Sequence, residues 1–317
     1  MAQILTITLN PTVDLSSSAA SVTPGPKLRC TPPEADPGGG GINVSRAIRF
    51  LGGESTAFTA VGGETGALLL RLLAEEGVRF TAFSVSGGAT RQSMAITDQA
   101  SGEQYRFVMP GPSWNHDMVD ESLNAIAAAA TVGGIVVLSG SQPPGVPVDY
   151  TARLSRRLSA HGIQLFVDTS GAPLHELVKH PANPYVLRMD DVEAEDLAGR
   201  ALPTRTDTAD FAQTLVERGV AENVIVARGS DGSTLVNASG RWHASRAIEP
   251  ADVVSAVGAG DSFVGAFSMA LTRGDTFQQA LCFGTSAASA AVLTAGTQLC
   301  SAQDVMRLLP GCVLVEV

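Results

Sequence analysis

Short apolar runs and amphipathic stretches alternate along most of the chain. Ile4 to Leu9 is an apolar, β-branched run that stops at Asn10-Pro11, the pattern of a buried strand leading into a loop. Comparable runs recur at residues 55–61, 134–138, 164–168, 185–187 and 223–227, separated by helical patterns such as 65–76 and 148–161. This alternation predicts an α/β fold with a mostly parallel central sheet flanked by helices. Because ligands bind beyond the carboxyl ends of such strands, we expect the functional residues there.

One segment departs from this rhythm. Residues 92–97 and 104–109 alternate apolar and polar positions on either side of the turn-forming stretch 98–102, which predicts a β-hairpin. An isolated hairpin is only marginally stable in water, so we expect it to join strands from the region Val13 to Thr31 in a small sheet. An ordinary hairpin packed on the main core is the alternative.

Together these patterns predict one domain rather than several. We expect residues 1–317 to form a single α/β unit that carries a small β-sheet lid, built from about 12–34 and 90–109. The 44% hydrophobic content is sufficient for one sizeable core.

Charge and composition narrow the range of partners. The chain has 31 acidic and 21 basic side chains, a formal net charge of −10, and no basic cluster, so a nucleic-acid partner is not expected. The longest apolar runs are far below the roughly 20 residues that a membrane span needs, and no membrane partner is expected. The four cysteines show no Cys-x-x-Cys spacing and the start of the chain lacks a secretion signal, which predicts a cytoplasmic protein.

The strongest chemical signal is the run Val257-Gly258-Ala259-Gly260-Asp261, which leads into a helical stretch. Glycines let a phosphate approach the backbone closely, and N–H groups at a helix N-terminus favour anions. Asp261, in the first turn, could accept a proton from a hydroxyl that attacks a bound phosphoryl group. The alternative is a simple turn whose acidic residue complements the helix dipole.

A second signal lies near the start of the chain. Four consecutive glycines, Gly38 to Gly41, precede apolar residues at helical spacing: Val44, Ala47, Ile48 and Leu51. Glycine loses more backbone freedom on folding than any other residue, so this run indicates close approach by a ligand, with a flexible loop as the alternative. Asn43 is suited to cap the helix or to bond a sugar hydroxyl, and the two roles are compatible.

The two signatures, in this order and spacing, resemble the paired motifs of the ribokinase-like PfkB carbohydrate kinases. The resemblance covers essentially the whole chain. It sharpens to the bacterial 6-phosphofructokinase branch through ungapped runs at residues 8–14, 27–31, 90–92, 101–111 and 139–146. It implies a ribokinase-like fold whose lid closes over a sugar phosphate, a homodimer formed through the lid, and ATP and Mg²⁺ as cofactors, with a monovalent cation such as K⁺ as a further candidate.

The same resemblance implies roles for individual residues. The backbone of Gly258, Ala259 and Gly260 would form an anion hole beside Asp261 as base. Sugar hydroxyls would be held by Asp14, Gly38, Gly39 and Asn43, and the phosphate already on the sugar by Lys27, Arg91 and Ser139. Cations and hydroxyl donors suit a dianionic phosphate. Taken alone, Asp14 is as compatible with a local turn bond, and Arg91 with a solvated surface charge.

The nucleotide half departs from the family pattern. Where the family usually has Lys-Pro-Asn-x-x-Glu, this chain has Arg188-Met189-Asp190-Asp191-Val192-Glu193. The residues expected at the nucleotide are Arg188, Asp190, Gly229, Gly232, Val257, Gly258 and Gly260. Glu193 and Asp190 are the expected Mg²⁺ ligands, because Mg²⁺ tolerates carboxylates, usually through water.

The reaction implied is transfer of the ATP γ-phosphoryl group to O1 of fructose 6-phosphate. Tagatose-6-phosphate kinase and 1-phosphofructokinase are the alternatives within the class, because epimers that differ at one hydroxyl are not separated by motifs. From another class, the altered residues Arg188 and Asp190 leave open a catalytically weak sugar-phosphate-binding regulatory protein.

Overall fold

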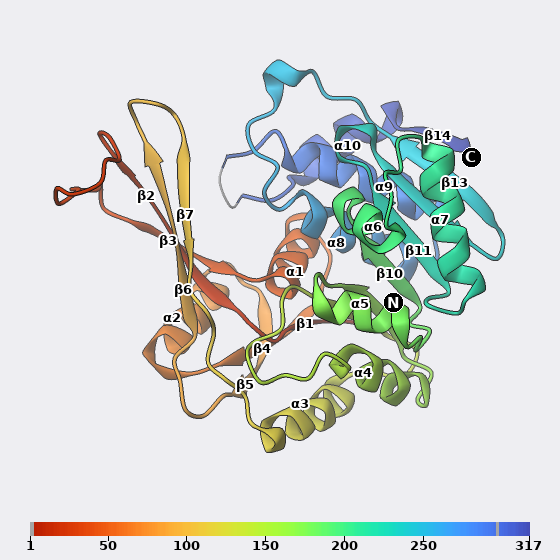
Figure 1. Cartoon of the computed structure of the whole chain (residues 1–317), viewed down its shortest axis with the longest axis horizontal. Helices are drawn as coiled ribbons and strands as arrows, with labels where there is room; N and C mark the ends of the chain where they lie inside the picture. Colours follow the sequence, from red (N-terminus) through yellow and green to blue (C-terminus); the bar gives the residue numbers. More distant parts are fainter. Residues whose placement is uncertain (1–2, 296–297) are drawn as a thin grey trace.

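A computed structural model describes residues 3–295 and 298–317 of the protein. Within these residues ten strands form one large sheet, which occupies the body of the molecule in Figure 1. In spatial order they are β14 (Val313–Glu316), β13 (Gly240–Ser245), β12 (Ser233–Asn237), β11 (Asn223–Ala227), β10 (Val186–Met189), β9 (Gln164–Asp168), β8 (Ile135–Ser139), β1 (Ile4–Thr8), β4 (Thr56–Val61) and β5 (Arg79–Ser84).

The strands from β5 to β11 pair in parallel, and β12, β13 and β14 add an antiparallel edge. Each strand expected from the apolar runs is present, so the prediction of a mostly parallel α/β sheet is confirmed. The central place of β1 in the sheet explains why all five of its residues are buried. Leu5 and Ile7 belong to the core on one face of the sheet and Ile4 to the core on the other, as a strand covered on both faces requires.

Helices cover both faces. On one face lie α1 (Gly40–Phe50), α8 (Ala259–Thr272), α9 (Phe277–Ala291) and α10 (Ala302–Leu308). On the other lie α3 (His116–Ala129), α4 (Tyr150–Ser159), α5 (Ala172–Lys179), α6 (Asp191–Ala198) and α7 (Arg205–Glu217). Among the described residues, every helix is too short or too polar to cross a membrane.

A separate sheet stands to one side of this body (Figure 1), and four strands of the described chain form it. They are β3 (Glu34–Gly38), β2 (Thr12–Ala19), β6 (Arg91–Asp98) and β7 (Gln104–Val108), in that spatial order. The expected hairpin is present as the antiparallel pair β6 and β7. Of its partners, β2 falls in the expected region, whereas β3 begins only at Glu34.

The register of the small sheet separates two faces. Met94 pairs with Phe107 and Ile96 with Tyr105, so the apolar side chains share one face. Ser93, Ala95, Arg106 and Val108 occupy the intervening positions and share the other face. The base of the sheet packs on α2 (Gly63–Glu75) through Val13, Leu69 and Leu73, which joins the small sheet to the main body.

Candidate active site

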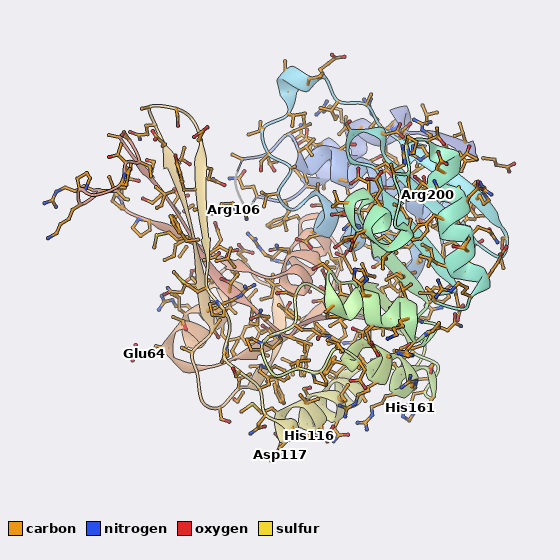
Figure 2. The ribbon with its side chains drawn as sticks, viewed as in Figure 1. Glu64, Arg106, His116, Asp117, His161 and Arg200 are labelled. Atoms are coloured by element: carbon orange, nitrogen blue, oxygen red, sulfur yellow. The ribbon has the colours of Figure 1, made fainter. Side chains whose placement is uncertain are left out.

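A cavity of about 250 Å³ lies between the small sheet and the beginning of α8. The small sheet contributes Asp14, Ser93 and Arg106, and Figure 2 shows Arg106 on the side of that sheet facing the main body. The main body contributes Asn43, Val257, Gly258 and Asp261. The structure thus brings together residues from both glycine motifs.

The start of α8 depends on Gly258. This residue is the N-cap and adopts a left-handed conformation with φ 78°, which favours glycine. The N–H of Ala259 donates to the carbonyl of Ala256 over 3.4 Å. Within the described residues, the N–H groups of Gly260 and Asp261 have no acceptor. Two backbone donors at the positive end of α8 are therefore available to an anion.

Asp261 projects from the first turn of α8 into this cavity. Burial, followed by the negative charge of Asp168, raises the pKa of Asp261 to about 6. A hydrogen bond from Asn43 Nδ2 to Asp261 Oδ2, 3.0 Å long, opposes this increase in pKa. The result is a carboxylate whose pKa is closer to physiological pH than usual, which favours proton transfer there.

Asn43 does not cap α1. That helix begins at Gly40 with Gly39 as N-cap, so Asn43 lies in its first turn and its side chain is free to reach Asp261. The capping interpretation of Asn43 is wrong, because the helix starts earlier than the apolar spacing indicates. Gly38 ends β3, Gly39 is the N-cap of α1, and Gly40 and Gly41 are its first two residues, so the flexible-loop alternative is also wrong.

Close packing explains glycine at positions 40 and 41. A Cβ on Gly40 would overlap Ser139 Oγ, and a Cβ on Gly41 would overlap the carbonyl of Ile7. The beginning of α1 therefore lies directly against the carboxyl ends of β8 and β1. Gly39 has φ 119°, a conformation that side chains rarely adopt.

Asp14 lies on β2 and faces the cavity. Its Oδ1 accepts a hydrogen bond from Ser93 on the adjacent strand, so the local turn bond considered for Asp14 is not what the structure shows. A Cβ on Gly38 would overlap the Asp14 carboxylate, which explains glycine at this position of β3.

Three residues expected at the sugar's phosphate do not line this cavity. Ser139, at the end of β8, donates to Asp168 Oδ2 over 3.2 Å. Arg91, at the start of β6, is half-buried, and its Nη1 donates to the carbonyl of Met109 over 3.4 Å. Lys27 is exposed in the loop between β2 and β3 and has no side-chain partner among the described residues.

On the nucleotide side, Arg188 lies beneath the start of α8. Its Nη1 is 3.0 Å from Asp168 Oδ1, and a Cβ on Gly260 would be 3.1 Å from Arg188 Nη1. The buried Nε of Arg188 has no partner within the described part of the chain. A guanidinium therefore lies behind the two free amides, where its positive charge adds to that of the helix terminus.

Asp190 and Glu193 form a capping box at the start of α6. Asp190 Oδ1 accepts from the N–H of Glu193 over 2.8 Å, and Glu193 Oε2 accepts from the N–H of Asp190 over 2.9 Å. One oxygen of each carboxylate remains outside these bonds. Burial raises the pKa of Glu193. The described residues contain no group of three or more candidate metal ligands. Two hard oxygen donors suit Mg²⁺, which usually takes its other ligands from water and phosphate.

Gly229 and Gly232 flank a short turn after β11. Gly232 has φ 110°, and a Cβ there would overlap the carbonyl of Ala244 on β13. Packing alone is therefore sufficient to explain why residue 232 is a glycine, without a bound nucleotide. The neighbouring Arg228 is paired with Asp231 over 3.0 Å.

Sequence reasoning missed several residues of this region. Asp168 ends β9 and contacts both Ser139 and Arg188. Its position at the carboxyl end of a predicted strand is the signal that marks it as a candidate site residue. Arg106 was recognised only as part of a polar face. Nothing in the local sequence indicates that this face is directed at the cavity.

Comparisons with known proteins show which family this chain resembles. Residues 4–304 match the pfkB family of carbohydrate kinases. The ATP-dependent 6-phosphofructokinase isozyme 2 of Mycobacterium tuberculosis is 38% identical over 307 residues, covering 96% of this chain and 88% of that protein. The protein of the same name from Escherichia coli is 38% identical over 311 residues, covering 97% and 98%. A 1-phosphofructokinase from Bacillus subtilis is 30% identical, covering 97% of each chain.

Solved structures show the same fold. Phosphofructokinase-2 from Escherichia coli in complex with potassium superimposes with a TM-score of 0.92 at 37% identity, covering 98% of this chain and 99% of that one. The same enzyme in complex with fructose 6-phosphate gives 0.89 at 36% identity with the same coverage. Its tetrameric inhibited form gives 0.90. The expectation of a ribokinase-like α/β fold with a small additional sheet is confirmed.

Proposed function

Because the chain belongs to the pfkB family of carbohydrate kinases, we propose that it transfers the γ-phosphoryl group of ATP to O1 of fructose 6-phosphate. The observation that carries this proposal is the placement of Asp261. A carboxylate with its pKa raised to about 6 faces the cavity beside two unpaired amides at a helix N-terminus. This arrangement suits a base for an attacking hydroxyl next to donors for the transferred group.

In this mechanism Asp261 accepts the proton of the O1 hydroxyl. O1 forms a bond to the γ-phosphorus, the bond from that phosphorus to the β,γ-bridging oxygen breaks, and ADP leaves with the electron pair. The amides of Gly260 and Asp261 stabilise the transferred group, with Arg188 behind them. The donors of this anion hole are therefore the amides of Gly260 and Asp261. Gly258 and Ala259 contribute the backbone turn that positions these two amides.

The acceptor is held mainly from the small sheet and the start of α1. Asp14, Gly38, Gly39 and Asn43 bind its hydroxyls in this proposal. Asp14 and Asn43 line the cavity, and Gly38 lies directly against the Asp14 carboxylate, which supports the assignment. Ser139, Arg91 and Lys27 bind its phosphate, and since they lie outside the cavity, this assignment requires the small sheet to close. In that sense the small sheet acts as a lid on a single domain, with β2, β6 and β7 inside the expected segments 12–34 and 90–109 and β3 extending beyond them to Gly38.

Arg106 is an additional candidate for the substrate anions. It lines the same cavity as Gly258 and has no side-chain partner among the described residues. A guanidinium in this position meets phosphate oxygens as the cavity narrows, and its planar fork suits them.

In this proposal the nucleotide binds at Arg188, Asp190, Gly229, Gly232 and Val257, of which Val257 lines the cavity. Asp190 and Glu193 would hold Mg²⁺ through their free oxygens, and the ion would neutralise charge on the phosphates. The potassium in one related structure supports a monovalent cation as a further cofactor. These assignments and a cytoplasmic location stay predictions.

The acceptor is tested by measuring ADP release with Mg-ATP over fructose 6-phosphate, tagatose 6-phosphate, fructose 1-phosphate and unphosphorylated sugars. We expect fructose 6-phosphate to give the highest kcat/KM. The 38% identity to 6-phosphofructokinases against 30% to a 1-phosphofructokinase favours this order. Highest kcat/KM with fructose 1-phosphate would reassign the substrate, and absence of turnover with every acceptor would favour a binding or regulatory role.

We also propose that the protein is a homodimer joined through its small sheet. The face of that sheet opposite Arg106 exposes Phe107, Met94 and Tyr105, with Phe107 52% exposed. Clustered exposed apolar side chains usually mark an interface. A related structure is a tetrameric form, and sedimentation of this chain distinguishes a dimer from a tetramer.

A further inference from the structure

Arg46 is a buried arginine in the middle of α1. Its side chain is only 4% exposed, and it forms a two-pronged ion pair with Glu76, which directly follows α2. Nε lies 2.6 Å from Glu76 Oε2 and Nη2 lies 2.8 Å from Oε1. Burying such a pair carries a desolvation penalty that often cancels its attraction, so stability alone is a weak explanation for it.

The remaining arm of Arg46 points toward the proposed site. Nη1 donates to Asn43 Oδ1 over 3.3 Å and to the carbonyl of Pro37 over 3.4 Å. Asn43 has two chemically different ends, an oxygen that only accepts and an NH₂ that only donates. Because a cation occupies the oxygen end, the NH₂ end is directed at the Asp261 carboxylate, 3.0 Å away. A reversed amide would place one oxygen against another and direct its donors at the guanidinium.

This chain of contacts links four elements. Glu76 follows α2, which packs under the small sheet, and Pro37 belongs to β3 of that sheet. Arg46 and Asn43 belong to α1, and Asp261 to α8. Arg46 thus connects the base of the small sheet to the carboxylate through one intermediate side chain.

We propose that Arg46 is a positioning residue for phosphoryl transfer: anchored by Glu76, it fixes the amide orientation of Asn43 and thereby holds the Asp261 carboxylate toward the cavity. The proposal rests on the proposed role of Asp261 as base. Arg46 itself touches no reacting atom.

A second consequence is electrostatic. The charged groups that act on Asp261 are Asp168 from β9, Arg188 from β10 and Arg46 from α1. Both arginines oppose the increase in the pKa of Asp261. Removing Arg46 therefore makes Asp261 protonate at higher pH, and it also releases Asn43, whose hydrogen bond acts in the same direction.

The test compares Arg46→Met with Arg49→Met. Arg49 lies one turn further along α1 and its Nε donates to the backbone carbonyl of the same Glu76 over 2.8 Å, but it does not contact Asn43. We expect Arg46→Met to lower kcat at neutral pH by about 10- to 100-fold, more than it changes KM for ATP, and to move the acid limb of the kcat profile to higher pH. Arg49→Met should leave both properties unchanged.

Glu76→Gln, which retains the arginine but weakens its anchor, is the second variant and should lower kcat in the same way by less. It keeps the test usable if Arg46→Met fails to fold. Either variant, folded by circular dichroism but with the wild-type kcat and acid limb, would overturn the proposal. Asp261→Asn is assayed in the same series. A wild-type kcat in that variant would instead overturn the proposed base, so the two failures are distinguishable.

Discussion

The side-chain amide of Asn43 donates to the carboxylate of Asp261 over 3.0 Å, although 218 positions separate the two residues in the chain. Each belongs to one of the two glycine-rich motifs. One helix terminus supplies the carboxylate and the free amides, and the other supplies the group that orients the carboxylate. Neither motif forms the site without the other, and this relationship leads to the first predictions.

The activity should depend on the ionisation of Asp261. Because burial and Asp168 raise the pKa of this carboxyl to about 6, the fraction able to accept a proton decreases as pH falls through that value. We expect kcat to be nearly constant from pH 7 to 8 and to decline about tenfold for each further unit below 6. The measurement is initial rate at saturating substrates over pH 5 to 8. A flat profile would contradict the assignment.

Replacing the carboxylate should affect turnover rather than binding. Asp261→Asn keeps the shape of the side chain and an oxygen for the Asn43 amide, but it removes the proton acceptor. We expect kcat to decrease by at least ~10²-fold, with little change in substrate affinity measured by calorimetry. A variant with near-normal kcat would remove Asp261 from the mechanism.

The same substitution should stabilise the fold. The folded state binds a proton at Asp261 more tightly than the unfolded state, so the ionised carboxylate opposes folding above pH 6, by about 3 kcal/mol at most. Asp261→Asn should therefore raise Tm at pH 8, and the gain should shrink toward pH 5.

Asp117→Asn is the matched control, since Asp117 is an exposed acidic residue in the first turn of α3 and favours its helix. That change should lower Tm slightly at pH 8. An equal gain in Tm for Asp261→Asn at both pH values would argue against a raised pKa.

Discrimination between phosphorylated and free sugars tests the sites assigned to the acceptor's phosphate. Arg91 and Lys27 are cations suited to a dianion, so unphosphorylated fructose should be a poor acceptor. We expect Arg91→Met to reduce kcat/KM for fructose 6-phosphate much more than for fructose. If the wild-type enzyme used both sugars equally well, a broader sugar kinase would replace the 6-phosphofructokinase proposal.

The oligomeric state can be tested by introducing charge on one face of β7. Phe107→Asp places a carboxylate on the apolar face and should dissociate the dimer in sedimentation experiments at micromolar concentration. Gln104→Asp adds the same side chain on the opposite face of the same strand and should leave the dimer intact. A fully active wild-type monomer would exclude the proposed interface.

The large sheet was predictable from the sequence because each of its strands is marked by a pattern of consecutive residues. Runs such as Ile135 to Leu138 are apolar at every position, and only strands covered on both faces require that pattern. The small-sheet hairpin was also predictable, from its period of two. The third strand was misplaced because Glu34 to Gly38 contains proline, glycine and acidic residues, which give no strand pattern.

Only those site residues that lie within a recognisable motif were predictable from the sequence. Asp261 and Asn43 stand out within their glycine runs. Asp168 and Arg46 lie in ordinary strand and helix sequences, and their importance comes from partners such as Arg188 and Glu76 that are distant in the chain. Contacts of this kind are set by how the elements pack together, which local patterns do not contain.

The central position of β1 in the large sheet also constrains how the chain can assemble during its synthesis. β1 lies between β4 and β8, so one of its edges can pair early with β4, whereas the other waits until β8 has been translated. During this interval an apolar strand keeps an open edge, which is a site for mispairing with other nascent chains. A ribosome that pauses shortly before Ile135 would prolong that exposure, and a chaperone that shields the open edge would be most useful there.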